Sequence, residues 1–259
     1  MENEKENKYT IQSVEKACDL LMLFGNSNTE IGVSELSRQL GVGKSTVWKL
    51  LNTFENKGIL VKNPVSEKYF LSVKFFQIAC QYYNQVSINS VVRSFMERLS
   101  ETYKETIHFA VRDENEIVYV EKIDGSFNIT ISSRIGRRSP IYTTAAGKAI
   151  LANQSQEKIK EYLDRVELKP FTENTIVSRE ALQQELEKIA AQGYAVDNEE
   201  YEANIKCVGV PIKNIAGRVV GGLSVSGMNA RMTDEKIAEI VRDLKEYSGE
   251  ITHRIGYNQ

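Results

Sequence analysis

The sequence has few cysteines and no long apolar run. Its 3 cysteines, Cys18, Cys80 and Cys207, are far apart, and none belongs to a C-x-x-C pair. This spacing argues against zinc and thiol-redox motifs and favours a reducing compartment. No stretch approaches the roughly 18 apolar residues of a membrane span, and the polar start MENEKENKYT lacks the apolar core of a signal peptide. We therefore expect a cytoplasmic protein without a membrane segment, metal or cofactor.

An excess of positive charge is also missing. The 259 residues carry a formal net charge of −2, so the protein is not a generally basic nucleic-acid binder, and any basic surface must be local. Hydrophobic residues make up 41% and charged residues 26%, as in ordinary globular proteins that build a core. The length suits two domains.

One stretch, residues 40–57, combines a turn with an amphipathic pattern. Its apolar residues follow helical spacing and share one face: Val47, Leu50, Leu51 and Phe54. A shorter helix is predicted at residues 33–40, and Gly41 separates the two, which is typical of a helix-turn-helix. Predicted strands at residues 59–61 and 69–71 follow. The N-terminal part, residues 1–72, is therefore predicted to be a winged helix-turn-helix whose first helix, residues 10–24, buries a stripe of Ile11, Val14, Cys18 and Leu21.

The same stretch contains GVGKST, which resembles the end of a nucleotide-binding phosphate loop. That motif needs a further glycine at position 38, where this chain has Arg38, and a strand before it. The preceding SELSRQL is helical in pattern. A recognition helix for DNA fits the residues better than an NTPase loop.

Local charge agrees with DNA binding, because residues 36–74 hold seven cations and two acids. Lys44 and Lys49 would contact phosphate or guanine, while Asn52 would contact phosphate or adenine. Trp48 would pack on a sugar or a thymine methyl, or else lie partly buried between helix and wing. The predicted DNA-binding residues are Lys44, Ser45, Thr46, Trp48, Lys49, Asn52 and Lys68.

The second half mixes short strands with helices and lacks strict alternation. Strands are expected near residues 106–111, 117–122, 127–132, 194–196, 207–212 and 218–226, with helices near 145–151, 156–166 and 178–192 and a last one capped by Thr233. Such an order favours an α+β domain on a mostly antiparallel sheet. We expect this domain at residues 87–259 and a linker helix at residues 73–86.

Three separated stretches predict a shared pocket: IYTTAAGKAILA at residues 141–152, DNEEYEANIKCVGVPI at 197–212 and GGLSVSG at 221–227. Small residues at a helix start let an anion approach the backbone N–H groups. Ser224 and Ser226 alternate on a strand and share one side. Each stretch also has a purely structural interpretation, in which Gly147 allows close helix packing, the serines satisfy local backbone groups and Asp197 caps a turn or pairs with a cation.

Over nearly its full length the chain resembles the IclR family of bacterial transcription regulators. The resemblance rests on IQSVEKACDLL, LSRQLGVGKSTVWKLLNTFENKGIL, PIYTTAAGKAILA, GYAVDNEEYEANIKCVGVPI and GGLSVSG. It implies a winged helix-turn-helix, a linker helix and a GAF-like effector domain, assembled as a homodimer or homotetramer on a palindromic DNA operator. It also implies a small organic acid as effector, bound by Ala145, Ala146, Asp197, Ile205, Cys207, Ser224 and Ser226. The DNEE run resembles the sugar-acid branch, which responds to compounds such as 2-keto-3-deoxygluconate; a simple 2-oxo acid is the alternative, and aromatic acids are less favoured.

A small-molecule enzyme is the rival interpretation, with Asp197 and Cys207 as an imagined catalytic pair. A cysteine nucleophile normally needs a base. The 2 histidines, His108 and His253, lie far in sequence from the pocket stretches. We therefore expect no catalytic residues. We expect a ligand-responsive transcription regulator, and a repressor of a carbon-catabolism operon is favoured over an activator.

Overall fold

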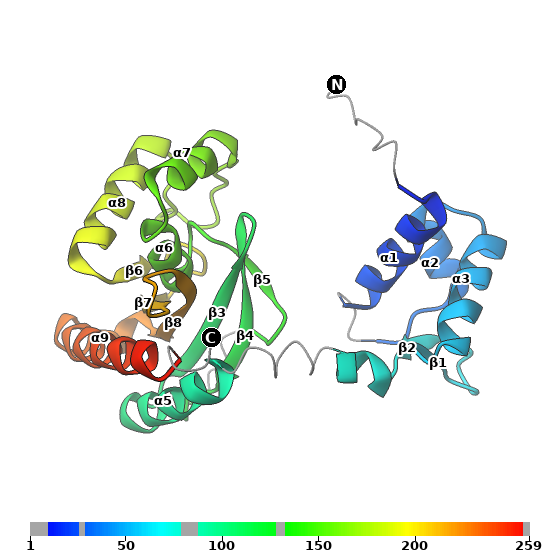
Figure 1. The fold of residues 1–259 in the computed structure, drawn as a ribbon, viewed down its shortest axis with the longest axis horizontal. Helices are drawn as coiled ribbons and strands as arrows, with labels where there is room; N and C mark the ends of the chain where they lie inside the picture. Colours follow the sequence, from blue (N-terminus) through cyan, green and yellow to red (C-terminus); the bar gives the residue numbers. More distant parts are fainter. Residues whose placement is uncertain (1–9, 26–28, 79–87, 128–132, 256–259) are drawn as a thin grey trace. The chain divides into compact units, whose positions relative to one another are not determined.

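The computed structural model describes residues 10–25, 29–78, 88–127 and 133–255. The chain divides into two compact units, Met1–Val86 and Ser87–Gln259 (Figure 1). Residues 73–78 are helical, and the rest of the predicted linker helix lies outside the described residues. A separate linker at residues 73–86 therefore stays a prediction. Residues 128–132 of the strand predicted at 127–132 also lie outside the described residues.

The N-terminal unit is a winged helix-turn-helix, as the sequence predicts. Its elements are α1 (Gln12–Gly25), α2 (Val33–Leu40), α3 (Lys44–Asn56), β1 (Leu60–Lys62) and β2 (Tyr69–Leu71). Strands β1 and β2 pair antiparallel, and Ile31 adds a bridge to Tyr69. A helix, α2, precedes GVGKST, so this motif has no strand before it and is the turn into α3.

The predicted stripe of the first helix is largely wrong. Ile11 and Val14 are 67% and 54% exposed, and Cys18 is exposed as well. The helix instead buries Leu20 and Phe24 against α2, α3 and the wing. Both sets of residues recur at helical spacing, and the pattern alone does not say which side meets the core.

The C-terminal unit is an α+β domain around a six-stranded sheet. Its strands are β3 (Thr106–Asp113), β4 (Glu116–Ile123), β5 (Arg138–Pro140), β6 (Ala195–Asn198), β7 (Ile205–Lys213) and β8 (Val219–Met228). They lie in the order β5-β4-β3-β8-β7-β6, and every neighbouring pair is antiparallel. The helices are α5 (Ile88–Tyr103), α6 (Ala145–Ala152), α7 (Gln156–Arg165), α8 (Arg179–Gln192) and α9 (Asp234–Ile255), with a 3-10 turn η1 (Asn229–Arg231).

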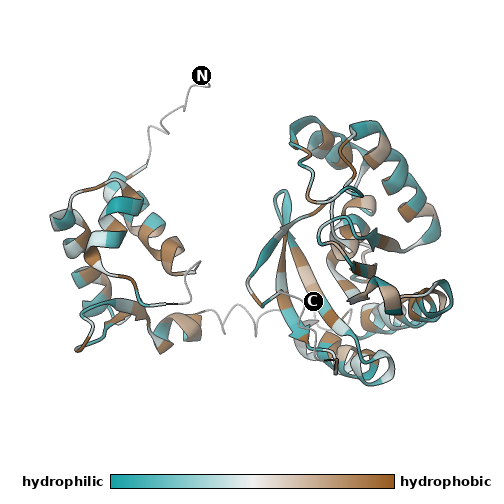
Figure 2. Cartoon of the chain, turned by 180° about the vertical axis from the view of Figure 1, so that it is seen from behind, coloured by the Kyte–Doolittle hydropathy of each residue, from teal (hydrophilic) through white to brown (hydrophobic). Residues whose placement is uncertain are grey.

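Helices cover both faces of this sheet (Figures 1 and 2). Helix α6 packs on β3, β6, β7 and β8 and also contacts α8, whereas α5 contacts β3 and β4, and α9 contacts β7 and β8. The α6 side has a core of its own, which includes Ile150, Leu182 and Leu186. Polar side chains also lie on the α6 side of the sheet, and these polar residues form the site described next. No helix in the described ranges has the length and apolar character needed to cross a membrane.

Candidate functional site

The first turn of α6 offers free backbone donors. Thr144 caps the helix, and its Oγ1 accepts a hydrogen bond from the N–H of Gly147 at 3.1 Å. The N–H groups of Ala145 and Ala146 have no partner inside the helix, because the first turn of any α-helix leaves such groups unpaired. They also make no hydrogen bond elsewhere in the described part of the chain. Two donors at the positive end of a helix favour an anion.

Glycines in the sheet bring this helix end close to the strands. A Cβ on Gly209 of β7 would lie 2.8 Å from the backbone of Ala145 and Ala146, and one on Gly222 of β8 would lie 2.8 Å from the carbonyl oxygen of Ala146. Such distances leave no space for any larger residue. The sequence therefore allows the start of α6 to rest directly on the sheet.

The register of the strands then gathers polar side chains beside the helix start. Asp197 lies opposite Cys207, and Cys207 lies opposite Ser226. Ser224 lies opposite His108 of β3. Residues directly opposite in an antiparallel pair point to the same face of the sheet. These side chains therefore form one polar surface across β6, β7, β8 and β3.

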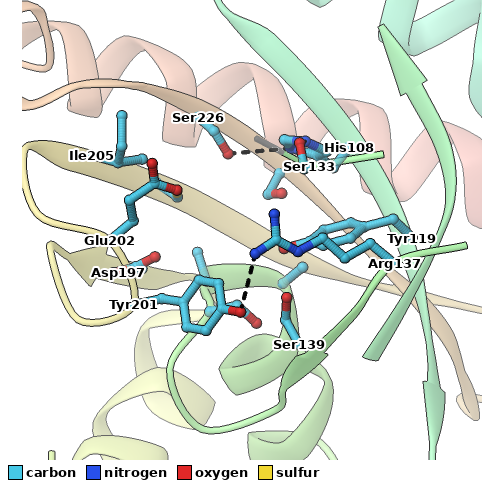
Figure 3. Close-up of a pocket in the computed structure, with 15 residues that line it drawn as sticks. His108, Tyr119, Ser133, Arg137, Ser139, Asp197, Tyr201, Glu202, Ile205 and Ser226 are labelled. Carbon is cyan, nitrogen blue, oxygen red and sulfur yellow. Dashed lines mark hydrogen bonds between the residues drawn. The ribbon is translucent and has the colours of Figure 1, made fainter. Parts of the chain in front are cut away.

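Together they line a cavity that is shown in Figure 3. All seven residues predicted to bind an effector lie in its wall: Ala145, Ala146, Asp197, Ile205, Cys207, Ser224 and Ser226. Its volume is about 500 Å³, which includes space open to solvent. The structure brings the predicted residues together, and their role in binding stays a prediction.

Eight further residues line the cavity that the sequence did not single out: His108, Tyr119, Ser133, Arg137, Ser139, Thr144, Tyr201 and Glu202. His108 is far along the chain from the pocket stretches, but the folded chain brings it into the cavity wall. Its Nε2 shares a hydrogen bond with Ser133 Oγ at 2.6 Å, and its Nδ1 lies 3.3 Å from Ser226 Oγ. The pairing of β3 with β8, 118 residues apart along the chain, creates this contact. No local signal in the sequence reveals such a distant pairing.

Burial sets the charge of the groups in the cavity. It lowers the pKa of His108 to about 3, assisted by the positive charge of Lys122, so this imidazole is neutral. Burial also raises the pKa of Asp197 to about 7, although the N–H of Glu200 donates to its Oδ1 at 2.8 Å and opposes the shift. The pKa of the Cys207 thiol is raised well above its usual value, mainly by burial. A protonated thiol is a poor nucleophile.

The exposed face of α3 carries the predicted DNA-binding residues. Lys44, Ser45 and Lys49 are exposed, Thr46 and Asn52 are partly exposed, and Lys68 is exposed in the turn between β1 and β2. Trp48 is 55% exposed, which favours its interpretation as a surface residue over that of a buried staple. Val47 and Leu51 are fully buried, as the spacing predicts. The helix is therefore anchored by one side and presents the other to solvent.

This combination of a winged helix-turn-helix and a polar cavity on an antiparallel sheet defines a ligand-responsive DNA-binding regulator. The chain belongs to the IclR family: residues 13–64 match the IclR helix-turn-helix domain, and residues 80–253 match the domain described as bacterial transcriptional regulator IclR C-terminal. It is 39% identical to the HTH-type transcriptional regulator KdgR of Escherichia coli K12, over 96% of this chain and 94% of that protein. It is 37% identical to the regulator KdgR of Dickeya chrysanthemi, over 96% of this chain and 81% of that protein.

A solved structure of the family agrees with the fold. The crystal structure of the Thermotoga maritima IclR matches with a TM-score of 0.79 and 35% identity, covering 96% of this chain and all of that chain. The family consists of transcription regulators, and the enzyme interpretation is therefore not favoured. The resemblance drawn from the sequence motifs is confirmed, and with it the fold class.

Proposed function

We propose that this regulator is a repressor that responds to a small hydroxylated organic acid bound in the cavity. The observation that carries the proposal is the juxtaposition of the free N–H groups of Ala145 and Ala146 with a hydroxyl-rich wall. A carboxylate suits the helix start. Serine hydroxyls and a neutral histidine can exchange hydrogen bonds with alcohol groups or a keto oxygen. The target is an operon of carbon catabolism, and the protein acts in the cytoplasm, where it meets both DNA and metabolites.

The lining favours a polar acid over an aromatic one. Besides the two alanines, its main apolar groups are Ile205 and the rings of Tyr119 and Tyr201, whereas its hydroxyl groups come from four serines, a threonine and these two tyrosines. The polar wall suits the head of a 2-oxo acid, and the exposed side chain of Glu202 leaves a polar route outward for a longer chain. The similarity to the two regulators named KdgR supports a sugar acid such as 2-keto-3-deoxygluconate.

On DNA, the proposed unit is a homodimer or homotetramer on a palindromic operator. In a two-fold symmetric dimer the two α3 helices would read half-sites about 34 Å apart or a multiple of this distance. Lys44, Lys49 and Lys68 would contact phosphates, and Ser45, Thr46, Trp48 and Asn52 would lie near base edges or sugars. The effector can shift operator binding by no more than its difference in affinity for the two states of the protein.

A screen for thermal stabilisation tests the effector class. The panel contains pyruvate, D-gluconate, 2-keto-3-deoxygluconate and 4-hydroxybenzoate, followed by gel-shift titration on DNA selected from a random pool by the full-length protein. We expect a sugar acid or 2-oxo acid to raise the unfolding temperature and to weaken DNA binding. Stabilisation by the aromatic acid alone would contradict the proposed effector, and tighter DNA binding with the acid would contradict release as the response.

A further inference from the structure

The cavity presents a problem of charge for any acidic ligand. Two of its lining residues, Asp197 and Glu202, are carboxylic acids, and the neutral His108 cannot offset them. Like charges in a partly buried site repel more strongly than in water. Of the described residues that line the cavity, Arg137 is the one lysine or arginine. An anion next to these acids is therefore best accommodated against the guanidinium of Arg137.

The position of Arg137 is fixed by its backbone. Its carbonyl oxygen accepts a hydrogen bond from the N–H of Tyr119 at 3.1 Å, and the N–H of the neighbouring Gly136 donates to the carbonyl oxygen of Tyr119 at 2.7 Å. The N–H of Arg137 donates to the carbonyl oxygen of Arg134 at 3.0 Å. These hydrogen bonds tie the turn that carries Arg137 to strand β4. They fix the position of the Arg137 backbone in the cavity wall.

From this point the side chain reaches across the cavity. Figure 3 shows its guanidinium extending toward Tyr201, on the loop between β6 and β7. A guanidinium nitrogen donates to the hydroxyl of Tyr201 at 3.4 Å, a long contact, and the charge lies 5.9 Å from the centre of that ring. Tyr201 in turn packs on Phe171 at 5.1 Å between ring centres. The guanidinium therefore lies in the cavity wall, and a guanidinium can donate two parallel hydrogen bonds to a carboxylate.

We propose that Arg137 is a specificity-determining residue of the effector site, which binds the carboxylate of the ligand together with the start of α6. The inference rests on the proposed acidic effector and adds the residue that selects for its charge. A bidentate guanidinium–carboxylate pair fixes the plane of the acid and leaves the remainder of the ligand facing the serines. Uncharged polyols of the same length lack this partner and are excluded.

Arg138 provides a matched control. It is the next residue, it is also an arginine, and its side chain lies outside the cavity wall. Its guanidinium donates to Asp113 and Glu116 at 2.6 Å each, so it takes part in a surface ion-pair network. Replacing either arginine by glutamine removes one positive charge, and only Arg137→Gln removes it from the cavity.

The test is isothermal titration of full-length protein with 2-keto-3-deoxygluconate, pyruvate and D-gluconate, with D-glucitol as the uncharged comparison. We expect Arg137→Gln to weaken acid binding at least tenfold, Arg137→Lys to weaken it less, and Arg138→Gln to leave it within twofold. D-glucitol should bind neither wild type nor variants. Unfolding temperatures without ligand and DNA binding of each variant verify that the fold is intact.

Two results would overturn the inference and are distinguishable. If wild type binds an acid and Arg137→Gln binds it equally well, Arg137 is not the anchor while the proposed function stands. Equal binding of D-glucitol and D-gluconate by wild type would likewise remove the role of charge. If wild type binds none of the acids and still binds DNA, the acidic effector itself is wrong, and the role of Arg137 falls with it.

Discussion

The ammonium of Lys148 on α6 lies 2.5 Å from the carboxylate of Glu200, and both side chains are buried. The same ammonium donates to the carbonyl oxygen of Val196 at 2.7 Å and to Glu185 at 3.2 Å, so all three of its protons have acceptors. The N–H of Glu200 donates to Asp197 in the cavity wall. This chain of contacts ties the helix that starts at the cavity to the loop after β6.

Replacing Lys148 by methionine should therefore destabilise the domain strongly. It would leave the buried Glu200 carboxylate without its cation, a loss of about 3–5 kcal/mol in the free energy of unfolding. Urea unfolding of wild type and variant measures it. The more exposed partner gives the control, since Glu185→Gln should cost at most about 1 kcal/mol. A Lys148→Met protein as stable as wild type would show that the pair contributes little.

The stability of the protein should depend on pH through Asp197. Its pKa is about 7 in the folded state, against about 3.9 in an unfolded chain. Between these values the folded state holds a proton that the unfolded state has lost, so the contribution of Asp197 to stability is fully present below about pH 4, falls as pH rises from about 4 to 7, and no longer changes above this range. The change is on the order of a few kcal/mol. Other ionisable groups near it are Glu200, Lys148, Cys207, Arg137, Glu202 and His108.

Asp197→Asn should remove this part of the pH dependence, because asparagine keeps an oxygen for the N–H of Glu200 without a charge. Chemical unfolding at several pH values from 5 to 8.5 measures it. An unchanged slope would mean that Asp197 does not take up the proton. A carboxylate ligand should also bind wild type more tightly at pH 6 than at pH 8, since Asp197 is then neutral.

Gly209→Ala should disturb the cavity through the backbone. The new methyl group would lie 2.8 Å from the backbone of Ala145 and Ala146 and push the start of α6 away from the sheet. Overpacking of this kind typically costs about 1–3 kcal/mol, and we also expect the stabilisation by an acidic ligand to disappear. Gly249→Ala in α9 is the comparison. Nothing lies within 4 Å of its new Cβ, so it should stabilise by about 0.5–1 kcal/mol. Equal behaviour of the two variants would argue against close packing at Gly209.

Changing Lys44 and Lys49 to alanine should weaken binding to selected DNA sharply and leave the unfolding temperature unchanged. Both side chains are exposed on α3, and neither residue belongs to the apolar core of this unit. If each contacts a phosphate, the slope of log affinity against log salt should fall by about one unit per lysine. Lys57→Ala, at the C-terminal cap of the same helix, shows the effect of removing one positive charge elsewhere and is compared with each single variant. If the double variant had the same DNA affinity and the same salt slope as wild type, the assignment of α3 as the recognition helix would be wrong.

The buried side of an element could be predicted from the sequence where the spacing within that one helix or strand decides it. The spacing of Val47, Leu50, Leu51 and Phe54 fixes which side of α3 is buried, and the helical context of Arg38 excludes a phosphate loop. The motifs around Ala145, Asp197 and Ser224 predicted a shared site because each places small or polar residues where an element begins or alternates. For the first helix the pattern was ambiguous, since Ile11 and Leu20 belong to different faces that are both apolar.

Composition and periodicity by themselves determined the two-part architecture, the amphipathic helix α3 and the stretches from which a ligand site would be built. Tertiary structure alone decided what else enters that site. His108 reaches the cavity through strand pairing across 118 residues, and Arg137 reaches it from a turn tied to Tyr119. The same packing raises the pKa of Asp197 and joins Lys148 to Glu200. These effects depend on burial and on contacts between distant segments, and neither quantity exists until the chain has folded.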